Sequence, residues 1–120
     1  MDASNSIAGL IRKGLVVIIN WKFTDESGEK PRPTVVVVME PTGEDVTVAM
    51  ITSSAPKFNY PIIALKNSDF KQGSIDHESF IRPDMLQTIR ANRILKIIGD
   101  LTDQKYLELS EAIANLTKKN

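Results

Sequence analysis

The 120-residue sequence predicts a mainly β (α+β) domain, in which short strands form a small, strongly bent sheet or barrel that is followed by one C-terminal helix. Several short stretches alternate apolar and polar residues or are rich in β-branched residues, as strands do. Apolar residues recur at helical spacing near the C-terminus. The length suits a single domain, which we place at residues 14–120, after an N-terminal extension at 1–13.

The first predicted strand, Leu15–Phe23, has an apolar residue at every odd position. A long polar loop with two prolines, Thr24–Pro33, follows it. Thr34–Met39 is a nearly continuous valine run, which indicates a second strand buried on both faces. Pro41–Glu44 is a turn, and Asp45–Ile51 alternates again as a third strand.

The middle of the chain is more polar. Thr52–Tyr60 is predicted as a second loop, Ile62–Leu65 as a short fourth strand and Lys66–His77 as a polar loop. The apolar stretches Ser79–Ile81 and Leu86–Ile89 follow, and the sequence suggests that Pro83 interrupts them.

The last strand is predicted at Arg93–Ile98, with Gly99 ending it. Thr102 can cap a helix that begins at Asp103. One apolar stripe along this helix is formed by Tyr106, Leu109, Ile113 and Leu116.

Composition excludes several classes of function. Without cysteine there is no disulfide scaffold and no thiolate metal site. His77 is the only histidine, so a catalytic triad or a multi-histidine metal site is not expected, and we predict no metal and no cofactor. Fifteen basic and fifteen acidic residues cancel, which argues against binding nucleic acid through bulk charge but allows a local basic groove. Neither a membrane span nor a signal peptide is visible, so a cytoplasmic protein is expected.

Four pieces of the sequence, in this order and spacing, resemble the MazF/PemK toxins of bacterial toxin–antitoxin systems. They are Lys30-Pro31-Arg32-Pro33 before the valine strand, Ile51-Thr52-Ser53, the segment 79–89 that contains Arg82-Pro83-Asp84, and Ile98-Gly99-Asp100-Leu101 before the helix. The resemblance extends from about Gly14 to Leu116. It implies an SH3-like barrel of the MazF/PemK/CcdB type, usually a homodimer, and a metal-independent endoribonuclease that cuts single-stranded RNA at short sequences. It also implies a cognate antitoxin that binds over the RNA site.

The resemblance assigns catalytic roles to four residues. Arg32 would stabilise the negative phosphorane and could donate a proton to the leaving oxygen, and Thr52 would hydrogen-bond the scissile phosphate. Arg82 and Asp84 match an acid/base step in which Asp84 could accept the proton of the 2′-OH. RNA supplies this nucleophile itself, so the products would be a 2′,3′-cyclic phosphate and a 5′-OH.

Other residues are candidates for binding RNA. Lysines contact phosphates and aromatic rings stack on bases, so the candidates are Ser53, Lys30, Lys57, Phe58 and Tyr60. Trp21 lies on the apolar side of its strand, where core packing is favoured. His77 is expected to be solvent-exposed, in a loop away from the four motifs.

Each of these residues also has an ordinary structural interpretation. Arg32 could be a surface arginine at the start of a strand, the hydroxyls of Thr52 and Ser53 could bond to the turn backbone, and Pro83-Asp84 could be a turn or a cap. Three other functions stay open. They are a catalytically silent relative that binds RNA or a protein, a gyrase poison (disfavoured because no aromatic residue follows Tyr106) and an unrelated small barrel.

Overall fold

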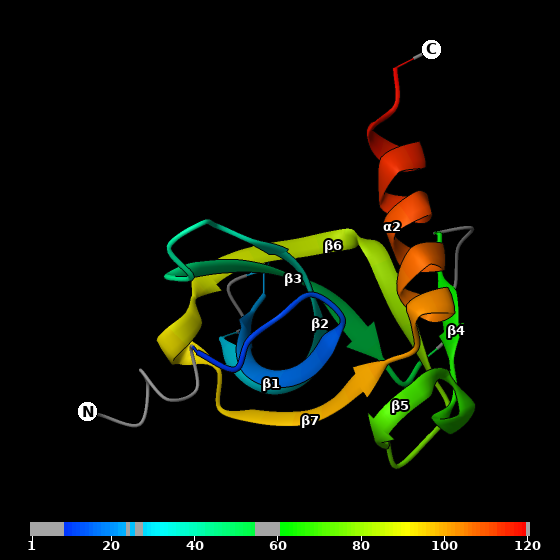
Figure 1. The fold of residues 1–120 in the computed structure, drawn as a ribbon, viewed down its shortest axis with the longest axis horizontal. Coiled ribbons are helices and arrows are strands. Elements are labelled where there is room, and N and C mark those ends of the chain that lie inside the picture. The colour runs from blue at the N-terminus through cyan, green and yellow to red at the C-terminus, as the bar shows by residue number, and fades with distance from the viewer. Residues whose placement is uncertain (1–8, 24, 26–27, 55–60, 120) are drawn as a thin grey trace.

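A strongly curled antiparallel sheet with one C-terminal helix forms the domain, which confirms the predicted fold class (Figure 1). The computed structural model describes residues 9–23, 25, 28–54 and 61–119. In these residues the elements are β1 (Leu15–Lys22), β2 (Glu29–Met39), β3 (Asp45–Thr52), β4 (Ile63–Leu65), η1 (Asn67–Asp69), β5 (Phe70–Gly73), β6 (Ser79–Arg90), η2 (Ala91–Arg93), β7 (Lys96–Leu101) and α2 (Asp103–Thr117). The strands are hydrogen-bonded in the order β4-β6-β3-β2-β1-β7-β5.

Both faces of the sheet carry a hydrophobic core. We call one face of the curled sheet the inner face. Its cluster contains the alternate residues Leu15, Val17, Ile19 and Trp21 of β1. The outer face is covered by α2, and its cluster contains Val35, Val37, Ile51, Ile81 and Leu109. Because Val36 belongs to the inner cluster and its two neighbours to the outer one, the valine run is buried on both faces, as predicted. The core position of Trp21 is likewise confirmed.

The loop predicted at Thr24–Pro33 is shorter than expected, because β2 already begins at Glu29. Pro31 and Pro33 pair with residues of β1, whereas pairing of β2 with β3 starts only at Thr34. This part of β2 therefore has a partner strand on one side only. A proline, which has no N–H, is tolerated there because its nitrogen can face the open edge.

The predicted break at Pro83 is also wrong. β6 is one continuous strand from Ser79 to Arg90. Its pairing with β3 moves from Met50↔Arg82 to Ala49↔Leu86, so residues 83–85 form a bulge. A bulge removes the need for an N–H at the proline and bends the strand without ending it.

Two further boundaries differ from the prediction. The polar segment Lys66–His77 contains η1 and the edge strand β5, which carries polar residues because one side of it is open to solvent. β7 begins at Lys96 instead of Arg93, because residues 91–93 form a 3₁₀ turn closed by a 3.1 Å bond from Ile94 N to Ala91 O. Gly99 lies inside β7 and does not end it.

Gly73 fixes the end of β5 against β7. Its φ is +80°, and a Cβ there would overlap the backbone of Ile98 and Gly99. We expect Gly73→Ala to lower the free energy of unfolding by about 1–3 kcal/mol or more, through the left-handed backbone and the overlap. Urea denaturation measures the change. Gly43→Ala is the matched control, since Gly43 has a similar positive φ of 76° but a Cβ added there would meet nothing within 4 Å. Equal losses in both variants would show that the close approach of β5 and β7 contributes nothing.

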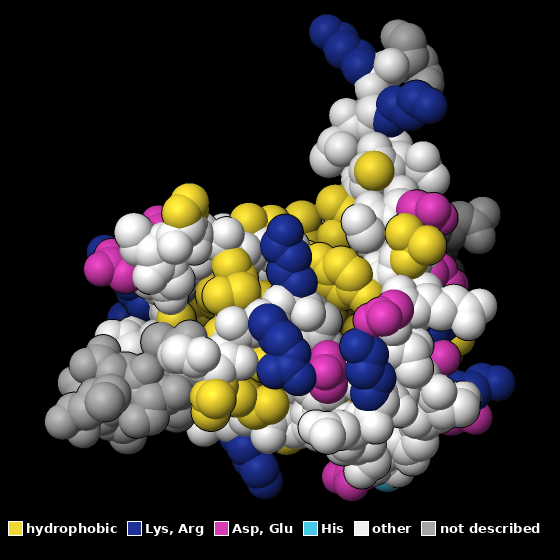
Figure 2. Space-filling view, viewed as in Figure 1, with side chains coloured by type: hydrophobic (Ala, Val, Ile, Leu, Met, Phe, Trp, Pro, Cys, Tyr) yellow, Lys and Arg dark blue, Asp and Glu magenta, His cyan; other side chains and the backbone are white. Residues whose placement is uncertain are grey.

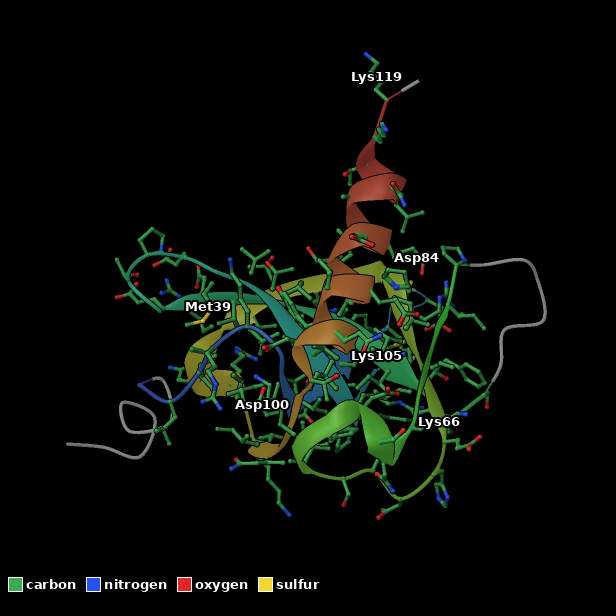
Figure 3. All side chains as sticks on the ribbon, turned by 45° about the vertical axis from the view of Figure 1, so that its right-hand side comes forward. Met39, Lys66, Asp84, Asp100, Lys105 and Lys119 are labelled. Atoms are coloured by element: carbon green, nitrogen blue, oxygen red, sulfur yellow. The ribbon has the colours of Figure 1, made fainter. Side chains whose placement is uncertain are left out.

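The C-terminal helix begins where the sequence predicts. The Thr102 hydroxyl accepts a 3.2 Å hydrogen bond from Lys105 N, and the Tyr106 hydroxyl donates to Val37 O at 3.2 Å. Leu109 is fully buried, but Leu116 of the same stripe is 46% exposed because the helix projects beyond the sheet (Figures 1 and 3). No helix in the described ranges is long and apolar enough to cross a bilayer.

Candidate functional site

The strand register brings Arg32, Thr52 and Arg82 to one region of the inner face. Thr34 of β2 pairs with Met50 of β3, which pairs in turn with Arg82 of β6. Arg32 precedes Thr34 by two residues and Thr52 follows Met50 by two, so the antiparallel arrangement puts them at the same end. Residues that are directly opposite, or two apart along a strand, point to the same face. Three motifs that are distant in the sequence therefore meet on adjacent strands.

Arg32 is held at the edge of the inner cluster. It pairs with Ile19 of β1, and its guanidinium carbon lies 5.8 Å from the centroid of the Phe23 ring, within range for a cation–π contact. The residue is half-buried. This position differs from that of a freely solvated surface arginine, because strand pairing fixes the backbone and the Phe23 ring contacts the guanidinium.

The Thr52 hydroxyl makes contacts with the turn that follows β3. It accepts a hydrogen bond from Ser54 N at 3.2 Å and donates a weak one to Ser54 O at 3.4 Å. The ordinary structural role of this hydroxyl, a bond to the turn backbone, is thus present. Ser53 is exposed and, by strand alternation, points to the opposite face, so the two hydroxyls do not act on one group.

Arg82 and Asp84 form a bidentate ion pair across the bulge at Pro83. Arg82 Nε donates to Asp84 Oδ1 at 2.8 Å, and Nη2 donates to Oδ2 at 2.7 Å. The side chains are 14% and 27% exposed. The hydrogen bonds from Arg82 lower the pKa of the Asp84 carboxyl, more than its partial burial raises it, so Asp84 is ionised at neutral pH. Asp84 is labelled on β6 in Figure 3.

Of the remaining candidates for binding RNA, the structure describes only some. Lys30 precedes Arg32 by two residues on the same side of β2 and is exposed. Lys57, Phe58 and Tyr60 lie outside the described residues. In the part of the chain that the structure describes, no group of three or more His, Cys, Asp or Glu side chains could hold a metal ion.

A cleft of about 630 Å³ contains residues that the sequence analysis did not connect. Arg32 and Ser53 line it together with His77, which is exposed as expected but is not remote from the motifs. The prediction of a distant His77 is wrong because the segment before it forms η1 and β5, which return the chain to the sheet. Lys96 of β7 also lines the cleft, and nothing in its sequence surroundings indicated this.

The side chains that meet on the inner face can bind a phosphate and accept a proton. The Arg32 guanidinium can supply planar donors to phosphate oxygens, and its charge persists when it is partly buried. Arg82 directs two of its N–H groups to Asp84. Asp84 supplies an ionised carboxylate that can accept a proton. Donors fixed in place before the reaction can stabilise charge that develops on a phosphorus centre. We refer to Arg32, Thr52, Arg82 and Asp84 as the inner-face site.

Comparison with known proteins bears on this site. The fold is similar to the Mycobacterium tuberculosis toxin MazF-mt6, at 25% identity and a TM-score of 0.64 over 87% of this chain and 94% of that one. It is also similar to an endoribonuclease in complex with its cognate antitoxin from a mycobacterial species, at 15% identity and a TM-score of 0.67 over 88% of this chain and 92% of that one. No curated protein matches by sequence. The family model described as PemK-like, MazF-like toxin of type II toxin–antitoxin system matches residues 12–117, and the chain therefore belongs to this toxin family.

Proposed function

We propose that this toxin is a metal-independent, sequence-specific endoribonuclease that cuts single-stranded RNA by attack of the 2′-OH on the adjacent phosphorus. The observation that carries the proposal is the meeting of Arg32, Thr52 and the Arg82–Asp84 pair on three adjacent strands. The attack forms a 2′,3′-cyclic phosphate and breaks the bond to the 5′-oxygen, which leaves as a 5′-OH. Two relatives of similar fold are described as endoribonucleases, which agrees with this chemistry.

Arg32 has the central role in this mechanism. As the phosphorane forms, negative charge accumulates on its non-bridging oxygens, and a guanidinium placed there beforehand lowers the barrier. The ring of Phe23 holds Arg32 in position from one side. Arg32 also donates the proton that the leaving 5′-oxygen requires, or orders a water that does so.

Thr52 and Asp84 complete the site. The Thr52 hydroxyl turns from its weak 3.4 Å bond to Ser54 O and donates to a phosphate oxygen instead. Asp84, ionised at neutral pH, accepts the proton of the 2′-OH, and Arg82 fixes the orientation of its carboxylate through the two short bonds.

The test is cleavage of long single-stranded RNA in excess EDTA, with the ends of the products mapped. We expect cuts at one short sequence, 5′-OH ends and 2′,3′-cyclic phosphates, without added metal. Dependence on a divalent ion or 5′-phosphate ends would contradict the mechanism. RNA binding without any product would favour the catalytically silent relative.

We also propose that the toxin is a homodimer and that a cognate antitoxin covers the RNA site. Beyond α2, the outer face of the sheet exposes Val38 (51%) and Leu86 (41%) around a pair of threonines. The hydroxyls of Thr47 and Thr88 bond to each other at 2.6 Å, so this surface presents few unsatisfied polar groups. Figure 2 shows hydrophobic side chains gathered on the sheet near the base of α2. An exposed apolar surface of this kind suits a two-fold contact with a second copy.

The dimer gives a direct prediction. Leu86→Glu places a charge in the proposed contact and is expected to convert the protein from dimer to monomer, because a buried unpaired charge is costly. Light scattering after size-exclusion chromatography measures the mass. Leu95→Glu is the control, since Leu95 is 53% exposed and its backbone bonds to Ile18 of β1 instead of the strands that carry Val38 and Leu86. A dimer that survives Leu86→Glu, or one that Leu95→Glu disrupts equally, would contradict this surface.

A further inference from the structure

We propose that the cleft lined by Arg32, Ser53, His77 and Lys96 is a nucleotide subsite, which holds one base and phosphate of the RNA next to the scissile phosphate. The inference deepens the proposed function and rests on it. Ser53 and Lys96 lie on the outer face, and the cleft meets the inner-face site at Arg32, which belongs to both. A strand of RNA bound at Arg32 would therefore extend into a preformed hollow of about 630 Å³.

The loop that carries His77 is anchored at both ends. At its start Gly73 packs against Ile98 and Gly99 without room for a side chain. Ile75 N donates a 2.8 Å hydrogen bond to Asn67 Oδ1, and the Ser79 hydroxyl donates to His77 O at 3.0 Å. These contacts fix the backbone of the loop beside the cleft before any ligand arrives, which reduces the ordering cost of binding.

The chemistry of the walls fits a nucleotide. Ile18 of β1 and Ile98 of β7, both half-buried, give the cleft an apolar wall. A base can lie against this wall and stack on the His77 imidazole, since bases of single-stranded RNA stack on aromatic rings. Lys96 and Arg32 supply two positive charges against the one negative charge of Asp76, so the lining favours a phosphate. Hydroxyls such as that of Ser53 can read the base edge or the 2′-OH.

Binding is tested by NMR with nucleoside 5′-monophosphates as probes. His77 is the only histidine, so the signals of its imidazole need no assignment in ¹⁵N-histidine-labelled protein. Titration with each of the four nucleotides is expected to shift these signals in a saturable way for at least one base. Lys96→Ala should weaken this binding by roughly tenfold, the effect of losing one good contact, and Lys118→Ala at the end of α2 should leave it unchanged.

Two results would overturn the inference. The first is that none of the nucleotides moves the imidazole signals at millimolar concentration. The second is that inorganic phosphate moves them as strongly as any nucleotide, which would make the cleft a general anion site.

Cleavage kinetics separate this inference from the proposed function. His77→Ala is expected to raise KM for RNA by about tenfold and to leave kcat nearly unchanged, because a subsite binds substrate and transition state alike. An unchanged KM in an active His77→Ala enzyme would refute the subsite but not the ribonuclease. Wild-type protein that neither cuts nor binds RNA would remove both. A cleft that binds an antitoxin peptide but no nucleotide would show that the occupant is a protein.

Discussion

Replacing Arg32 with alanine is expected to lower the rate of RNA cleavage by on the order of 10²–10³-fold, as loss of one fixed donor to a developing charge does in other enzymes. The effect should appear mainly in kcat, because the phosphorane carries more negative charge than the ground-state phosphodiester. Initial rates on an RNA with a single mapped cut measure it. Arg32 also lines the cleft that we propose as a nucleotide subsite, so a smaller rise in KM is expected as well.

The fold should survive this substitution. Arg32 lies at the end of β2 that pairs with β1 alone, and its aromatic contact is the one with Phe23. Loss of a cation–π contact near the surface costs about 0.5–1 kcal/mol. Thermal unfolding followed by circular dichroism should therefore show only a small decrease in Tm.

Two further variants sharpen the test. Arg32→Lys keeps the charge but loses the planar fork of donors, so its rate should fall between those of the wild type and Arg32→Ala. Arg93→Ala removes an exposed arginine of η2 that belongs neither to the inner-face site nor to the cleft, and it should cut RNA normally. Cleavage by Arg32→Ala at the wild-type rate would show that the site is elsewhere or that a contaminating nuclease is present.

The sequence predicted those helices and strands in which buried residues recur at a regular spacing. Alternation in β1 and the valine run of β2 each reflect a face that packs against a core, and both are confirmed. The stripe on α2 is confirmed only where the helix contacts the sheet, since Leu109 is buried and Leu116 is 46% exposed. The predictions were wrong where the local structure depends on the neighbouring strands. Pro31 and Pro33 fit into β2 only because β3 does not reach them, and Pro83 fits into β6 only because a bulge receives it.

In the candidate site, too, the sequence predicted the residues but not their arrangement. Arg32, Thr52 and Arg82 could be selected as motifs, but their meeting depends on the pairings of Thr34 with Met50 and of Met50 with Arg82. No single motif encodes that register. His77 illustrates the converse error. Its polar surroundings suggested a remote loop, whereas β5 pairs with β7 and returns the following residues to the sheet beside Arg32.

The Arg82–Asp84 pair leads to the second large effect. If Asp84 is the base for the 2′-OH, Asp84→Asn should lower kcat by about 10²–10⁴-fold, the usual contribution of general acid–base catalysis. Asparagine retains the shape and can still accept a hydrogen bond from Arg82, but it cannot take up a proton. Asp45→Asn is the matched control, because Asp45 also pairs with an arginine, Arg90, at 3.4 Å and lies at the surface outside the site. Its cleavage rate should equal that of the wild type.

The pH profile decides whether Asp84 acts as this base. Arg82 lowers the pKa of Asp84, so the carboxylate is the form present at neutral pH. The carboxylate is lost only when the pH falls below the ordinary aspartate pKa of about 4. Wild-type cleavage should therefore show no loss of ionised base between about pH 7 and 5. The same depressed pKa means that the pair stabilises the fold above the unfolded-state pKa and that this contribution disappears at low pH. A fall in rate between neutrality and about pH 5, in protein that remains folded, would contradict Asp84 as the base. A modest, pH-independent loss in Asp84→Asn would leave the carboxylate as a residue that positions Arg82.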